Sequence, residues 1–274
     1  MKMNLKITFV IVLSLLFLSY NSEVTSEDRT IVEMKTNYGT MVLELYNETP
    51  LHRDNFIKLV NDKAYDSLLF HRVIESFMIQ GGDPDSRNAK SGVLLGEGDL
   101  KYSVDAEFRP DLFHKKGALS TARSETLGRV SSAMQFFIVQ GKIYNDSLLD
   151  VSDSRINKML ARHYFLNQPA NETLWTALSK AEEEEDENLY KMLNDSVKVM
   201  VESYTDFENY SIPQTQREIY KTIGGTPHLD QNYTVFGQVI EGLDIVDSIA
   251  KVKKDKWDRP ISDVIILSVR LKTN

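Results

Sequence analysis

The residues best suited to chemistry are an arginine and a glutamine in the stretch FHRVIESFMIQGGD at 70–83. Arg72 stays protonated and presents several N–H donors in a rigid fork, and Gln80 supplies a carboxamide. Phe77 and Met78 add large apolar groups beside them. A fixed set of donors next to an apolar floor suits the binding of a neutral peptide better than it suits hydrolysis.

Two short strands around a turn would position these groups. The polar pair at 75–76 separates two apolar runs, and two glycines end the second run. Successive side chains of a strand point to opposite faces. Arg72 should therefore share a face with Ile74, and Gln80 should share a face with Met78.

This stretch resembles the signature of the cyclophilin family of peptidyl-prolyl cis-trans isomerases, which reads FHRVI..FM.QGGD. Three later segments add to the resemblance. ALSTAR at 118–123 is similar to the family's G.LSMAN strand, and QFFIV at 135–139 is similar to its SQFFI strand. The family pattern resumes in GGTPHLD at 224–230 and continues in YTVFGQV at 233–239.

The resemblance implies a role for each matched position. Arg72 would donate to the prolyl nitrogen, and Gln80 would hold a substrate carbonyl or a backbone group beside it. The other matched positions would hold the proline ring or line the groove around it: Phe77, Met78, Ala122, Gln135, Phe137, His228, Leu229 and Tyr233. Phe136, next to Phe137, is expected in the core.

Three positions depart from the family pattern, two of them from that of its eukaryotic members. His228 replaces a tryptophan and Tyr233 replaces a histidine, and both changes look like those of bacterial-type members. Arg123 replaces an asparagine that the family uses mainly through its backbone. His228 could act as a general base, since its unperturbed pKa is near neutrality. No nucleophile motif accompanies it, so we expect it at the rim of the pocket.

The resemblance covers 30–142 and 224–271. It implies a mainly-β fold, a closed eight-stranded antiparallel barrel capped by two helices, over an isomerase domain at 30–272. The residue pattern agrees with this order. Alternating apolar and polar residues predict a hairpin at 31–46, and a helix with Thr49 as its cap follows. A second helix is expected at 241–252, and a last strand with regularly alternating side chains is expected at 264–271.

Residues 150–222 interrupt the family pattern as a helical insertion, because their apolar residues recur at helical spacing. The acidic run at 182–187 predicts a solvated helix face. The apolar stripes must be covered by something. They either pack on one another and on the barrel or present a groove for unfolded client proteins.

The first 22 residues predict a targeting segment. Lys2 and Lys6 precede an apolar run at 7–18, which has the length of a signal-peptide core and is short for a membrane span. Residues 1–22 are thus a signal peptide or an uncleaved N-terminal anchor, and 23–29 are a tether. We expect an exported, periplasmic or extracellular protein, with membrane attachment possible through the leader.

The composition excludes several other functions. A net charge of −8 argues against nucleic acid, whose phosphates are bound by Lys and Arg. The absence of cysteine removes thiol nucleophiles and Cys-ligated zinc. Asp83-Pro84-Asp85 lacks the remaining ligand spacing of a calcium loop. No metal or cofactor is implied.

The function that follows is isomerisation of Xaa-Pro bonds in exported proteins, which would assist their folding. The expected partners are proline-containing peptides and unfolded or folding client proteins. Two alternatives remain. The chain could bind proline-containing peptides with little turnover, or it could be a chaperone that uses mainly its helical insertion.

Overall fold

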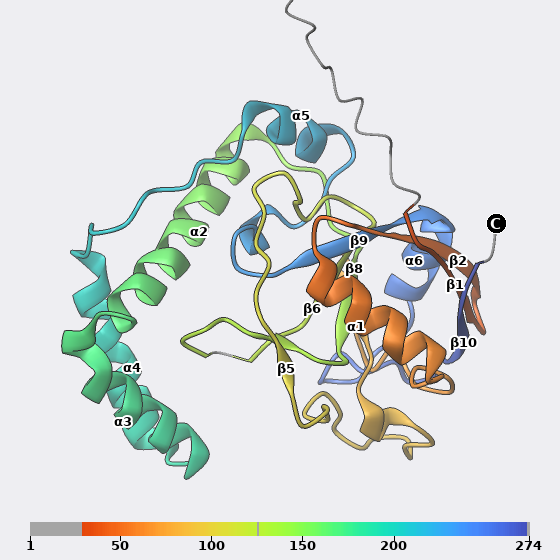
Figure 1. Cartoon of the computed structure of the whole chain (residues 1–274), viewed down its shortest axis with the longest axis horizontal. Helices are drawn as coiled ribbons and strands as arrows, with labels where there is room; N and C mark the ends of the chain where they lie inside the picture. The colour runs from red at the N-terminus through yellow and green to blue at the C-terminus, as the bar shows by residue number, and fades with distance from the viewer. Residues whose placement is uncertain (1–28, 125, 273–274) are drawn as a thin grey trace, which may run out of the picture.

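The structure, a computed structural model, describes residues 29–124 and 126–272. Its centre is one antiparallel sheet of eight strands, curled on itself, in the order β10-β1-β2-β9-β6-β8-β4-β3. The predicted mainly-β, eight-stranded antiparallel fold is confirmed (Figure 1). The strands of this sheet are β1 (Ile31–Thr36), β2 (Gly39–Leu45), β3 (Arg72–Ile74), β4 (Met78–Gly81), β6 (Ala118–Thr121), β8 (Phe136–Val139), β9 (Val235–Glu241) and β10 (Ile266–Leu271). A separate pair joins β5 (Ser103–Val104) to β7 (Ser131–Ser132).

Backbone hydrogen bonds join the two ends of the sheet. The segment that leads into β3 runs beside the segment that leads into β10, and Leu69 pairs with Ile265 there. The amide of Phe70 donates to the Val264 carbonyl at 2.9 Å, and the amide of Ile266 donates to the Leu68 carbonyl at 2.8 Å. These bonds cover edges that would otherwise stay open.

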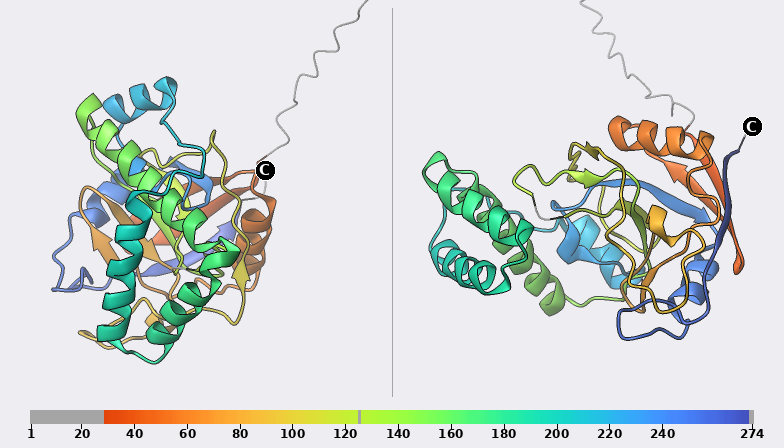
Figure 2. Two further views of the ribbon diagram at one scale, coloured as in Figure 1. Left: turned by 90° about the vertical axis from the view of Figure 1, so that its left-hand side faces the viewer. Right: turned by 90° about the horizontal axis from the view of Figure 1, so that it is seen from below.

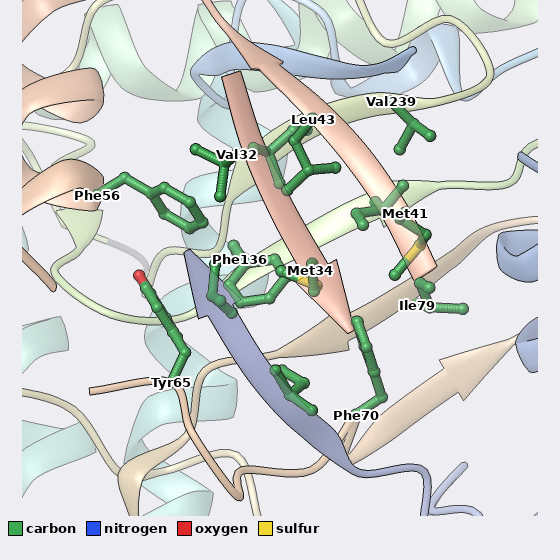
Figure 3. Packing of buried hydrophobic residues seen from close by; sticks show 14 of the residues in the cluster. Val32, Met34, Met41, Leu43, Phe56, Tyr65, Phe70, Ile79, Phe136 and Val239 are labelled. Carbon is green, nitrogen blue, oxygen red and sulfur yellow. The ribbon is translucent and has the colours of Figure 1, made fainter. Parts of the chain in front are cut away.

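The main core lies inside the curl of the sheet. On most strands every second residue points inward, and these residues meet the buried faces of α1 (Pro50–Asn61) and α6 (Leu243–Ala250) (Figure 3). On β8 the inward residues are Phe136 and Ile138, and the Phe136 ring meets Phe56 of α1 edge to face with centroids 5.9 Å apart. The prediction that Phe136 belongs to the core is confirmed. Phe137 therefore points outward, to the opposite face of the sheet.

Two local details differ from the sequence-based expectations. Thr49 occupies the N-cap of α1, but its side chain makes no capping bond. The Glu107 carboxylate instead accepts from the amides of Leu51 and His52 at 3.1 and 3.0 Å. In β10 the alternation breaks at Leu267, which has no partner on β1 and is 52% exposed. The extra residue is a bulge, which moves later side chains to the other face.

The insertion is helical, as predicted, and stands beside the barrel (Figure 2). It consists of α2 (Asp146–Leu166), α3 (Glu172–Glu183), α4 (Glu187–Glu202) and α5 (Gln214–Thr222). The acidic run at 182–187 is exposed where α3 turns into α4. Two small cores hold the helices together. One joins Leu149 and Ile156 of α2 to Tyr220 of α5, and the other joins α2, α3 and α4.

No helix within 29–124 and 126–272 combines the length and the apolar character needed to cross a membrane. The predicted leader at 1–22 and the tether up to residue 28 lie outside the described residues.

Candidate active site

Antiparallel pairing brings the predicted catalytic residues into one row across four strands. Arg72 of β3 is opposite Gln80 of β4, and Gln80 is opposite Phe137 of β8. Phe137 in turn is opposite Ser120 of β6. Directly opposed residues of antiparallel strands point to the same face. Arg72, Gln80 and Phe137 are therefore neighbours on the outer face of the barrel, although 65 positions separate the first from the last.

A chain of hydrogen bonds holds the polar side of this row. The Gln135 amide nitrogen donates to the carbonyls of Gly96 and Gly98 at 2.8 and 2.7 Å. Its oxygen accepts from the Gln80 amide nitrogen at 2.9 Å, and the Gln80 oxygen accepts from Arg72 at 3.3 Å. Each amide thus has its oxygen and nitrogen assigned by its partners. Because the Gly96 and Gly98 carbonyls accept from the Gln135 nitrogen, the Gln135 oxygen faces the Gln80 nitrogen. The Gln80 oxygen therefore faces the Arg72 guanidinium.

The loop that supplies these carbonyls is fixed by Asp83, the last residue of the signature. Its carboxylate is fully buried and accepts from the amides of Gly96 at 2.5 Å and Asp85 at 2.8 Å. Gly98 packs so closely on this carboxylate that a Cβ there would collide with Asp83 Oδ1. Sequence reasoning missed this role of Asp83 and considered the residue only as part of a calcium loop, which it rejected. Its place at the end of the matched stretch was the available clue.

An apolar pocket adjoins the polar row. Met78, Phe137 and Leu229 are buried in one cluster on the outer face, and Phe77 and Tyr233 are partly buried against it. The rings of Phe137 and Tyr233 meet edge to face, with centroids 6.0 Å apart. Such a cluster can hold a proline ring by apolar contact, which costs no buried polar group.

His228 forms the rim of this pocket. Its ring stacks on Phe77, with centroids 5.6 Å apart and planes 25° apart. Burial lowers the pKa of His228 to about 4, with smaller contributions from His114 and Arg155. The imidazole is therefore neutral near pH 7, so this rim adds no charge beside the pocket.

A second histidine, which sequence reasoning did not single out, supports the pocket from below. His114 is fully buried and stacks on Phe137, with ring centroids 6.0 Å apart. Its Nδ1 lies 2.8 Å from Asp230 Oδ1, and its Nε2 lies 3.2 Å from Ser120 Oγ. This Ser–His–Asp order resembles that of hydrolases. However, Ser120 is 0% exposed and donates to the Thr234 carbonyl at 2.7 Å. The arrangement is structural, because no substrate can reach the hydroxyl.

The insertion reaches this buried support through α5. The Tyr220 hydroxyl donates to Asp230 Oδ2 at 2.7 Å, and both residues are buried. Burial also raises the pKa of Tyr220 well above 10, so the phenol keeps its proton as a donor. Helix α5 is thus part of the structure beneath the groove.

A cavity of about 470 Å³ continues from the polar row. Gln80, Ala122 and Gln135 line one side, and the loop at 96–103 lines the other. Ala122 is held between two strands, since its amide donates to the Gln135 carbonyl at 3.0 Å and its carbonyl accepts from Ser132 at 2.8 Å. All ten predicted site residues therefore lie together, around the row, the pocket or this cavity. Among the described residues no cluster of His, Asp or Glu could hold a metal ion.

Comparisons with known proteins point to one family. The model of the "cyclophilin type peptidyl-prolyl cis-trans isomerase/CLD" family matches residues 31–156 and 204–271. A Staphylococcus haemolyticus protein assigned as a peptidyl-prolyl cis-trans isomerase is 30% identical over 239 residues, covering 87% of this chain and 89% of that protein. A protein of Staphylococcus aureus strain COL with the same assignment is 31% identical over 250 residues, covering 91% of this chain and 94% of that protein.

Solved structures agree on the fold. A crystal structure of a cyclophilin-type isomerase from Cryptosporidium parvum matches with a TM-score of 0.52 at 19% identity, covering 90% of this chain and 99% of that one. The same protein in the presence of the dipeptide Ala-Pro matches with a TM-score of 0.51 at 20% identity, covering 89% of this chain and 99% of that one. At this identity the likeness concerns the fold alone.

Proposed function

The chain belongs to the cyclophilin-type peptidyl-prolyl cis-trans isomerases, and we propose that Arg72 is its catalytic donor and that exported proteins are its substrates. The chain is an isomerase that acts on proline-containing peptides. Its reaction, the rotation of an Xaa-Pro bond, breaks no covalent bond. The barrier of ~18–20 kcal/mol comes from amide resonance, and the uncatalysed step takes about tens to hundreds of seconds.

Catalysis requires stabilisation of the twisted amide. As the bond turns, the prolyl nitrogen loses conjugation, becomes pyramidal and gains a lone pair. A donor aimed at that lone pair stabilises the twisted state more than either planar ground state, which lowers the barrier. In this account the pocket of Phe77, Met78, Phe137 and Leu229 holds the proline ring, and the Arg72 guanidinium donates to the nitrogen.

One observation carries the assignment to Arg72. Within 29–124 and 126–272 the guanidinium has a single hydrogen-bond partner, the Gln80 oxygen at 3.3 Å, and its side chain is exposed. Several N–H donors are therefore available to a substrate, while the bond to Gln80 limits where they point. Gln80 would orient Arg72 or hold a neighbouring substrate carbonyl.

The variant Arg72→Gln tests this role. If Arg72 acts in the twisted state, the variant loses turnover while its affinity for an Xaa-Pro peptide changes by less than about threefold, because ground-state binding rests on the apolar pocket. Line-shape analysis of peptide NMR spectra measures exchange and affinity in one titration. A variant that loses affinity and turnover in equal proportion would place Arg72 in ground-state binding instead.

The proposal of exported substrates rests on the leader predicted at 1–22. We expect the native protein to be found outside the cytoplasm, either shortened at its N-terminus or attached to a membrane by it. Fractionation of the native cells, followed by mass determination of the protein's N-terminus, tests this. A full-length protein in the cytoplasmic fraction would contradict it.

A role in folding is supported by the outer face of α4. Met192, Val199 and Met200 share that face and are 59%, 69% and 46% exposed. The two methionines are flexible and polarizable, which suits contact with many unfolded sequences. We propose that this face holds client chains while their Xaa-Pro bonds turn over in the groove.

A triple variant of this face to Gln tests the idea. It should leave turnover of a short peptide unchanged, yet slow the proline-limited refolding of a whole protein. Ile143→Gln is the matched control, because Ile143 is a similarly exposed apolar residue outside α4. Equal refolding rates for the triple variant and the native protein would remove the client-binding role.

A further inference from the structure

A second cavity, of about 360 Å³, lies where the insertion meets the barrel. The barrel contributes Arg123 and residues 126–129 of one loop together with residues just before β9, and the insertion contributes α2, α3 and α4. Helices α3 and α4 belong to the segment 157–203 that the family match leaves out. We call this cavity the basic pocket, after its four cationic residues: Arg123, Arg129, Arg162 and Lys198.

The described residues that line the basic pocket include no acidic side chain. Arg123 and Arg129 donate to neutral backbone carbonyls, those of Asn232 at 2.7 Å and Gln231 at 2.9 Å. The Arg129 Nε is buried and has no partner in the part of the chain that the structure describes. Lys198 pairs with Asp195 at 2.9 Å, but this pair is on the surface, where such a bond is weak.

The positive charge of the pocket also lowers the pKa values of titratable groups that line it. Burial and then Arg123 lower the pKa of Arg129 to about 10. Burial, Arg129 and Arg123 lower the pKa of His163 to about 4. His163 is accordingly a neutral acceptor, and its Nδ1 receives a bond from the Asn167 amide at 3.0 Å. A pocket this basic stands out in a chain whose net charge is −8.

The basic pocket is continuous with the proline groove. Tyr233 lines it, and the same ring meets Phe137 with centroids 6.0 Å apart. The Arg123 guanidinium covers the Tyr233 ring at 4.8 Å, and Arg123 also lines the cavity beside Gln80 and Ala122. An extended chain advances ~3.3–3.6 Å per residue, so a substrate residue within about four positions of the proline can reach the pocket.

The walls of the pocket indicate which anion fits. Met159, Leu166 and Trp175 add apolar walls to the pocket beside the cationic groups. A glutamate offers a short apolar stem and a carboxylate that a guanidinium can bind through two parallel bonds. Lys198, whose side chain is 63% exposed, marks where the pocket opens to solvent.

We propose that the basic pocket binds an acidic side chain, preferably glutamate, of the substrate chain near the isomerised proline. This inference rests on the proposed function, since it adds a specificity site to the same groove. It makes the insertion a determinant of substrate choice. Unfolded chains with an acidic residue at the matching distance from proline would be preferred over neutral and basic ones.

A peptide series tests the proposal on the full chain. Each peptide carries one Xaa-Pro bond and has Glu, Gln or Lys at one position within about four residues of the proline. We expect at least one position where Glu exceeds Gln on the order of tenfold in both affinity and kcat/KM, because charge-assisted hydrogen bonds are about twice as strong as neutral ones. Lys at that position should be worse than Gln. The preference should shrink at ~1 M salt, where the screening length is about 3 Å.

Two variants and a control locate the effect. Lys198→Glu and Arg129→Gln should bring the Glu-to-Gln ratio toward one, whereas Lys180→Glu should not. Lys180 is exposed on α3 outside the pocket and undergoes the same charge change as Lys198. Equal affinity for Glu and Gln peptides at every position would overturn the proposal, even if all peptides were turned over. If no peptide were turned over, the catalytic assignment would fail, and the affinities would still decide the pocket. A phosphoserine peptide that binds tightly while Glu and Gln peptides bind alike would reject the carboxylate.

Discussion

The hydrogen-bond chain from Gly96 and Gly98 to Arg72 makes a specific prediction for Gln135→Leu. The variant loses three hydrogen bonds of 2.7–2.9 Å. At a net ~0.5–1.5 kcal/mol each, their loss should lower the free energy of unfolding by about 3 kcal/mol. The Gln80 amide is then free to flip its oxygen and nitrogen, and Arg72 loses the bond to Gln80 that orients it. A positioning loss of about 1 kcal/mol corresponds to roughly fivefold in rate.

The assay combines denaturant unfolding with kcat/KM on a short Xaa-Pro peptide. Gln216→Leu is the matched control, because Gln216 is a buried glutamine on α5 that donates to the Pro110 carbonyl at 2.6 Å, away from the row. We expect the control to lose stability but keep its kcat/KM. If Gln135→Leu is destabilised as calculated and yet retains full activity, the hydrogen-bond chain does not position the catalytic donor.

Three further outcomes follow from the same geometry. Tyr233→His should alter peptide affinity more than turnover, because no proton is transferred in the reaction; a hundredfold rise in kcat would refute this. Tyr220→Phe should lower the free energy of unfolding by about 1.5–3 kcal/mol, since it removes a bond to the Asp230 carboxylate; unchanged denaturant midpoints would show that α5 does not brace the groove. Burial lowers the pKa of His71 to about 4, so between pH ~6.5 and ~4 the unfolded chain binds a proton that the folded chain does not. As the pH is lowered through this range, the free energy of unfolding should decrease by up to about 3 kcal/mol. The fall should be smaller in His71→Leu, and equal pH dependence in both proteins would exclude that histidine as a source.

The sequence was sufficient for the strand pattern and for the residues that face the groove. Strand periodicity placed Arg72 on the face of Ile74 and Gln80 on the face of Met78, and the resemblance to the family signature added Phe137 to the groove. The apolar spacing in 150–222 likewise identified the insertion as helical. These features depend on local pattern, which a single sequence displays directly.

Contacts between distant segments that support the site could not be predicted from the sequence in the same way. Nothing local in the sequence links Glu107 to the start of α1, or Tyr220 to Asp230, because these bonds depend on how distant segments pack. The bulge at Leu267 was missed for a similar reason, since an apolar residue at that place fits either register. The basic pocket forms where α2, α3 and α4 approach Arg123 and residues 126–129 of the barrel.

The most direct test of the account is the isomerisation rate of a short Xaa-Pro peptide by the protein and by Arg72→Ala. We predict that the variant stays folded and loses roughly two to three orders of magnitude in kcat/KM, as for the loss of one transition-state hydrogen-bond donor worth about 2.7–4 kcal/mol. A folded variant that keeps more than half of the activity would contradict the central role of Arg72.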